Sequence, residues 1–127
     1  MSKQLNEIEL VLPRLAKNLY RELQRYRKGK LDDAQFTECF ENLLQSQHRW
    51  LITQGASEVR AALAVHGAVL VLSGPGLRAE AQETGQPLEV IEFRAVREAA
   101  TDVARSYPIN ELQAIRILNK IVARYGG

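Results

Sequence analysis

The side chains of this chain that best suit a binding chemistry are basic residues placed at helical spacing near its N-terminus. They follow one another at intervals of three, four, four and three residues: Arg14, Lys17, Arg21, Arg25 and Lys28. In an α-helix these residues share a basic stripe about 80° wide, and the opposite side carries Leu12, Leu15, Leu19, Leu23 and Tyr26. Such a row of cations suits phosphate groups. Because Lys and Arg are also good helix formers, a merely solvated face is the alternative.

Basic residues also recur toward the C-terminus. They stand at Arg94, Arg97 and Arg105, and then at intervals of four residues at Arg116, Lys120 and Arg124. The net charge is only +2, but Lys and Arg exceed acids over residues 1–30 and 93–127, whereas acids exceed them over residues 31–92. This asymmetry suits a nucleic-acid surface at the two ends of the chain. It suits contacts between basic and acidic faces of protein subunits equally well.

The residues that carry catalysis or bind metals are too few and too scattered for a reaction centre. The chain has two histidines, His48 and His66, and one cysteine, Cys39. A zinc site takes three or four such donors, and no spacing here places three on one helical face. We expect His66 to be a core histidine and Cys39 a buried, inert thiol. Residues 73–78 lack the lysine of a P-loop. We therefore expect no catalytic, metal-binding or cofactor-binding residue and no enzyme.

The spacing of the apolar residues predicts an all-α protein, because the helical period dominates from end to end. Glycine, proline and capping residues divide the pattern into helices near residues 13–28, 32–54, 57–73, 87–106 and 110–125. A short helical or irregular piece precedes Pro87. The helix at 57–73 has almost no polar face and so belongs in a core. We predict one domain over residues 1–127, a compact bundle of about five helices around this central apolar helix.

The segment before Pro13 is expected to form an N-terminal arm over residues 1–12. A proline inside a helix removes a hydrogen bond and costs about 3 kcal/mol, so the main helix is predicted to begin at Pro13. The arm is rich in apolar residues, and we expect it to pack on a neighbouring subunit or across its own bundle. A homodimer is the predicted assembly.

One segment carries a local sequence pattern of a known kind. Ala104 is small enough for a helix crossing, and a buried spacing with a capping residue follows at Ile109, Asn110, Ala114 and Ile117. With these residues, segment 103–118 resembles the helix-turn-helix of bacterial regulators and recombinases. The family usually has glycine where this chain has proline at position 108. The resemblance implies that the side chains facing the major groove or its phosphates are Glu111, Gln113, Arg116 and Lys120.

These features predict a binding protein. The N-terminus lacks the order of charges and apolar residues of a signal peptide, and the apolar run from Ala61 to Leu72 is shorter than the roughly 20 residues that span a bilayer. We therefore expect a soluble, cytoplasmic protein without a membrane partner. The leading interpretation is a self-associating helical protein that docks a protein partner through apolar and charge-complementary faces. The alternative is a nucleic-acid-binding regulatory or architectural protein that binds DNA or RNA through its basic helical faces.

Overall fold

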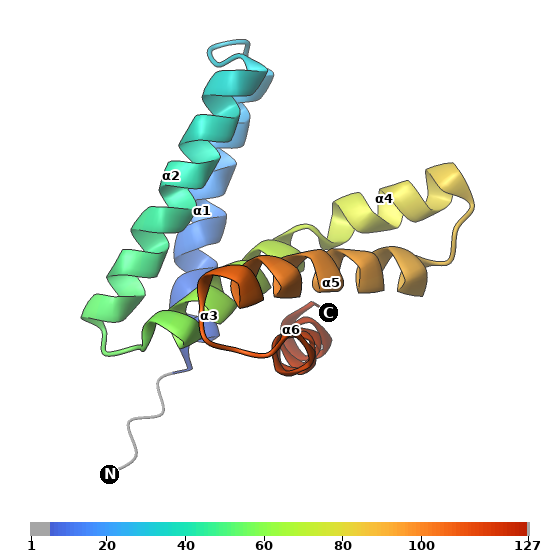
Figure 1. Ribbon diagram of the computed structural model, residues 1–127. Helices are drawn as coiled ribbons and strands as arrows, with labels where there is room; N and C mark the ends of the chain where they lie inside the picture. Colours follow the sequence, from blue (N-terminus) through green and yellow to red (C-terminus); the bar gives the residue numbers. More distant parts are fainter. Residues whose placement is uncertain (1–5, 127) are drawn as a thin grey trace.

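The computed structural model describes residues 6–126, and this part of the chain is all-helical without a strand (Figure 1). Six helices follow one another: α1 (Glu7–Arg27), α2 (Asp33–Thr53), α3 (Glu58–Leu72), α4 (Gly74–Thr84), α5 (Leu88–Ser106) and α6 (Glu111–Tyr125). The predicted all-α class is confirmed. About five helices were expected and the described residues form six, because the piece before Pro87, expected to be helical or irregular, is a regular helix with Pro75 in its first turn, where proline is tolerated.

Three of the helices begin at the caps that the sequence predicts. At α2 the Asp32 side chain accepts from the Gln35 backbone N–H at 2.8 Å, and the Gln35 side chain accepts from the Asp32 backbone N–H at 2.9 Å. Ser57 accepts from the backbone N–H of Arg60 at α3, and Asn110 accepts from two backbone N–H groups at α6. These bonds satisfy donors that have no partner inside the helix, so each cap sets where its helix begins.

The prediction that the first main helix begins at Pro13 is wrong, because α1 runs without a break from Glu7 to Arg27 and contains Pro13. The loss of one hydrogen bond at Pro13 is outweighed by burial, because Ile8, Val11 and Leu15 all lie in the core. Each such side chain contributes about 1.5–3 kcal/mol, against about 3 kcal/mol for the proline. Residues 7–12 of the expected arm thus pack within their own chain, and residues 1–5 of it lie outside the described part.

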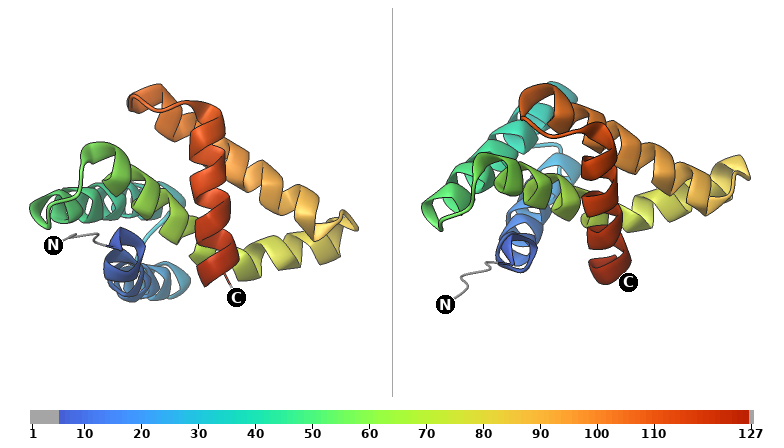
Figure 2. Two further views of the ribbon diagram at one scale, coloured as in Figure 1. Left: turned by 90° about the horizontal axis from the view of Figure 1, so that it is seen from below. Right: turned by 60° about the horizontal axis from the view of Figure 1, so that its bottom comes forward.

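The helices form two groups that meet at α3. The hairpin of α1 and α2 extends to one side of the molecule, and the pair α4 and α5 extends in another direction (Figure 1). One core cluster lies among α1, α2 and α3 and includes Val11, Leu51 and Ala61. The second joins α3, α5 and α6 and includes Val103 and Leu118. Figure 2 shows α6 crossing beside α3 and α5. The α1–α2 hairpin and the α4–α5 pair therefore each expose a long outer face.

α3 is the helix whose side chains are most completely buried, and it packs against each of the other five helices. Its small residues allow close approach, since a Cβ built on Gly67 would lie 2.8 Å from Cδ1 of Ile121 in α6. No single helix between residues 6 and 126 is long and apolar enough to cross a bilayer, although α3 and α4 together reach that length and composition with a bend of 51° between them.

A polar clamp joins the N-terminal end of α1 to α3 and α6. Arg60 of α3 holds the carboxylate of the buried Glu7 with two contacts, 2.7 Å from Nε to Oε1 and 3.1 Å from Nη2 to Oε2. Tyr125 of α6 accepts from the Asn6 side chain and donates to Oε1 of Glu9, both at 2.8 Å. Such a bidentate arginine–carboxylate contact fixes orientation as well as distance. The start of α1 is therefore held against its own chain.

Candidate functional site

The outer face of α1 carries a shallow groove whose lining is strongly basic. We call it the basic groove; it has a volume of about 430 Å³ and is lined by Lys17, Tyr20, Arg21, Gln24, Arg25, Lys28 and Lys30. Four of these residues belong to the predicted basic stripe. The helical spacing did not include Lys30, because this residue follows the end of α1. The Lys28-Gly29-Lys30 sequence, with a lysine on either side of a turn glycine, was the signal that could have added it. Gly29 adopts a φ of +74° in this turn, a conformation that glycine reaches without steric cost.

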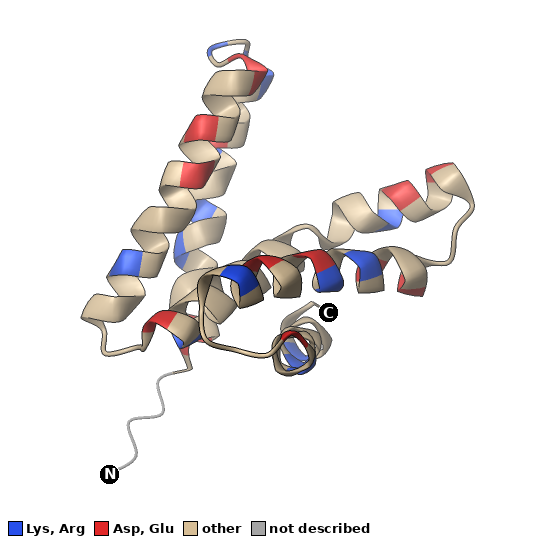
Figure 3. Cartoon of the chain, viewed as in Figure 1, with Lys and Arg blue, Asp and Glu red and all other residues tan. Residues whose placement is uncertain are grey.

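The cations of the basic groove are largely uncompensated. Arg25 pairs with the half-buried Glu22 at 3.1 Å on the neighbouring flank of α1, and because the Arg25 side chain is exposed, solvent weakens this pair. Within residues 6–126, no carboxylate pairs with Lys17, Arg21, Lys28 or Lys30. Of the residues that the structure describes, no acid lines the groove. Figure 3 shows Lys and Arg along α1 and in the loop at the tip of the α1–α2 hairpin, with acidic residues beside this loop at the start of α2. This face therefore attracts anions.

Arg14 does not belong to this site, contrary to the grouping of the basic stripe. Its Nε donates to Oε1 of Gln47 at 3.1 Å, and its guanidinium carbon lies 3.8 Å from the ring centre of Trp50. Gln47 is only 2% exposed, so Arg14 joins α1 to α2. The reason is geometric: Leu15, at the centre of the buried face, is only about 100° around the helix from Arg14. The stripe flanks the core instead of lying opposite to it.

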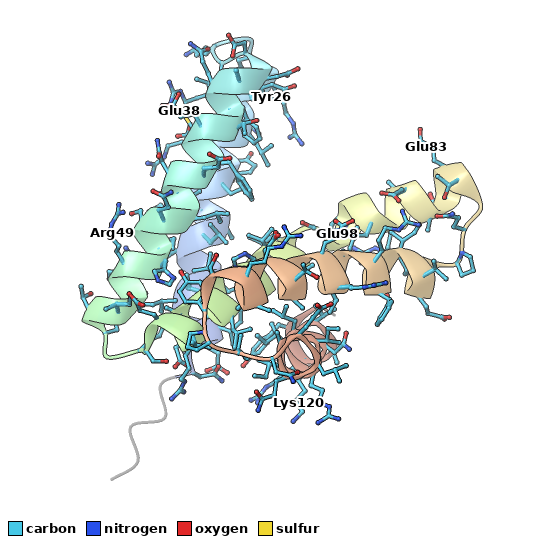
Figure 4. All side chains as sticks on the ribbon, viewed as in Figure 1. Tyr26, Glu38, Arg49, Glu83, Glu98 and Lys120 are labelled. Atoms are coloured by element: carbon cyan, nitrogen blue, oxygen red, sulfur yellow. The ribbon has the colours of Figure 1, made fainter. Side chains whose placement is uncertain are left out.

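The predicted basic residues of α6 lie on a different surface. Arg116, Lys120 and Arg124 are exposed, and none of them lines the basic groove. Arg124 lies 3.9 Å from Glu9 and over the ring of Tyr125. Lys120 projects outward from α6 (Figure 4). The eight candidate residues are thus divided among the basic groove, the α1–α2 contact and the outer face of α6.

The segment that resembles a helix-turn-helix departs from the expected side-chain pattern. Ala114 is buried, as the resemblance implies, but Ile117 is 37% exposed instead of buried. Glu111 accepts a hydrogen bond from Thr101 of α5 at 3.3 Å, so this side chain turns toward its own protein and away from any groove. Extended backbone at Tyr107 leads into the turn. The packing of α6 on α5 and α3 decides which of its faces is buried.

The arginines of α5 lie among acids. A shallow depression of about 380 Å³ is lined by Arg94, Arg97, Glu98, Thr101, Asp102 and Arg105. Arg94 also pairs with Glu80 of α4 at 3.7 Å and donates to Gln86. Alternating charges neutralise one another at short range. This face is therefore a mixed-charge surface, and the basic groove of α1 is the more selective site for anions.

The structure also brings both histidines to one pocket, which sequence reasoning missed. This histidine pocket has a volume of about 220 Å³ and is lined by Leu44, Gln45, His48, Arg49, Ala62, Val65, His66 and Tyr107. The rings of His48 and Tyr107 lie 5.7 Å apart. No sequence signal linked them, because the lining comes from α2, α3 and the end of α5.

Burial is the main cause of the pKa shifts of His48 and Cys39. It lowers the pKa of His48, and the charges of His66 and Arg49 act in the same direction, whereas Glu58 acts against them. Burial also raises the pKa of the half-buried Cys39 thiol, together with the neighbouring carboxylate of Glu22. A thiol with a raised pKa is a poor nucleophile. Between residues 6 and 126, no three His, Cys, Asp or Glu side chains are placed to hold a metal ion.

Comparisons with known proteins give no relative from which a function could be transferred. No protein-family model matches the chain, and searches of curated proteins and of solved structures found no significant match. Any functional assignment therefore rests on the geometry of the basic groove and of the histidine pocket.

Proposed function

We propose that this protein binds the phosphate backbone of nucleic acids through the basic groove of α1. The observation that supports the proposal is a groove with five basic side chains and no acid in its lining. Lys17 and Lys28 are eleven residues apart, which corresponds to about 16 Å along the helix axis. A backbone strand lying along the groove would place several phosphates within reach of these cations. Each neutralised phosphate releases a condensed counterion, which drives binding at low salt.

The composition of the groove favours binding without sequence preference. Its lining is dominated by Lys and Arg, whose attraction to phosphates is the same whatever the base sequence. Tyr20 is 62% exposed beside the cations. An exposed ring next to a phosphate-binding row is a surface on which an unpaired base can stack. We therefore expect single strands to bind at least as well as duplexes.

A second candidate function is protein–protein interaction. In this view the chain is a cytoplasmic helical protein that forms a homodimer or docks a protein partner. It is supported by Val90 and Phe93, which are 49% and 52% exposed and lie three residues apart, hence on one face of α5. This second proposal treats the chain as one domain with its helices packed around α3. A Phe93→Glu variant that changes the mass measured by light scattering would favour this function.

The test of nucleic-acid binding uses two variants that remove the same charge from different faces. The groove variant carries Lys17→Gln, Arg21→Gln and Lys28→Gln; the control variant carries Arg97→Gln, Arg105→Gln and Lys120→Gln. All six side chains are exposed, so both variants are expected to keep the helical circular dichroism of the wild type. Arg14 is left unchanged because it joins α1 to α2.

Fluorescence anisotropy with labelled duplex and single-stranded DNA and RNA measures the affinity over a range of salt concentrations. We expect the groove variant to bind more weakly and to flatten the slope of log affinity against log salt by about one unit per lost contact. The control variant should keep the wild-type slope. Absence of wild-type binding at micromolar protein in low salt would refute the proposal, as would an equal loss in both variants.

A further inference from the structure

The histidine pocket has the size of a small organic ligand. Its walls are mainly apolar toward α3, where Ala62 and Val65 lie, and toward Leu44 of α2. An apolar cavity of about 150 Å³ is large enough to bind benzene in a well-studied case. The volume here is about 220 Å³, so the pocket has room for one six-membered ring and a small polar substituent.

The polar groups of the pocket are of types that bind an anion. Arg49 is exposed at its edge and carries a permanent positive charge, and His48, His66 and Tyr107 add polar atoms to the lining. Nδ1 of His66 lies 2.9 Å from the carbonyl oxygen of Ala62. A carbonyl can only accept, so Nδ1 carries the proton. Nε2 then has no hydrogen-bond partner among the described residues, and it can donate to an anion only in the imidazolium form, in which both ring nitrogens carry a proton.

We propose that the histidine pocket binds a small single-ring carboxylate. The ring packs against Leu44, Ala62 and Val65, and the carboxylate faces Arg49 and the imidazoles of His48 and His66. A carboxylate accepts two parallel hydrogen bonds from a guanidinium, which a neutral amide cannot do. The site goes beyond nucleic-acid binding, because its lining residues and those of the basic groove have no member in common.

Binding of an anion in this pocket is coupled to proton uptake. The charged and titratable groups that act on His48 or line its pocket are Arg49 on α2, Glu58 and His66 on α3, and Tyr107 at the end of α5. Burial keeps the His48 imidazole neutral to lower pH than usual, and only Glu58 opposes this effect. A bound carboxylate would add a second negative charge and favour the protonated imidazole. By linkage, the affinity then rises as the pH falls, up to about tenfold per pH unit for each proton taken up.

The test uses benzoate as the probe and benzamide as its neutral counterpart on the full chain. Two-dimensional NMR at about pH 6 and pH 8 follows the backbone amides of residues that line the pocket. A carboxylate is ionised throughout this range, so any pH dependence reports the protein. Two variants reduce the polar contacts, Arg49→Gln at the edge and His66→Phe inside, and Arg97→Gln on α5 is the control for a lost positive charge.

We expect benzoate to shift pocket amides at pH 6 and to bind at least about fivefold more weakly at pH 8, with benzamide weak at both. Arg49→Gln and His66→Phe should each reduce benzoate affinity by about tenfold, as is usual for a lost charge-assisted hydrogen bond. Arg97→Gln should bind as the wild type does. Circular dichroism shows whether each variant is folded, and Arg49→Gln keeps the test valid if His66→Phe is not. Equal binding of benzamide, or no shift with millimolar benzoate at pH 6, would overturn the proposal.

Discussion

Replacing Arg14 by methionine should destabilise the protein although its side chain is exposed. Methionine keeps the apolar stem of the side chain and removes the guanidinium that reaches Gln47 and Trp50. A hydrogen bond from a charged donor contributes about 1.5–3 kcal/mol, and a cation–π contact at an exposed site about 0.5–1 kcal/mol. Because the guanidinium is partly screened by solvent, we take the lower end of both. The expected loss is about 2 kcal/mol.

Most of this loss comes from the partner that stays behind. Gln47 is 2% exposed, so without Arg14 its side-chain oxygen loses the guanidinium donor in a place with little access for water. Replacing both partners by apolar residues removes that penalty and can be almost neutral. We therefore expect the double variant Arg14→Met, Gln47→Met to recover a large part of the stability that Arg14→Met loses.

Urea unfolding followed by circular dichroism measures these differences, with Arg21→Met as the matched control. Arg21 lies on the same helix and has no ion-pair partner within the described residues, so its change should stay within about 0.5 kcal/mol. A loss of about 2 kcal/mol corresponds to a melting temperature lower by about 6–10 °C for a chain of this size. If Arg14→Met were as stable as Arg21→Met, the contact with α2 would not hold the hairpin as described.

Two further predictions concern the core and the pH dependence. Gly67→Ala should destabilise the protein by about 1–2 kcal/mol, because its Cβ would lie 2.8 Å from the stiff side chain of Ile121. Gly76→Ala should instead stabilise it, because the Cβ meets nothing within 4 Å and alanine has the higher helix propensity. Thermal unfolding of both variants measures this difference in sign. Burial lowers the pKa of His48, so the unfolded chain binds the proton first, and stability should fall as the pH drops below about 6.5. Urea titrations should show a smaller acid loss for His48→Gln, and equal losses in both proteins would contradict the assignment.

Local sequence determined the helices because their signals act over a few residues. The Asp32–Gln35 capping box, Ser57 and Asn110 satisfy backbone donors within the next turn, so no other part of the chain is needed to predict them. The apolar face of each helix follows from a period that is equally local. The all-α class and most helix boundaries were therefore predictable, and so was the row of cations at Lys17, Arg21 and Lys28.

Tertiary structure decided whatever depends on which helices meet. Pro13 lies inside α1 because distant residues bury the turn before it, and this energy is absent from any local rule. Arg14 stacks on Trp50 because α2 packs against the side of α1 on which Arg14 lies. His48 and His66 share a pocket because α2 and α3 are adjacent. Spacing along the chain places residues on a face of one helix, but only the packing of that helix decides what the face touches.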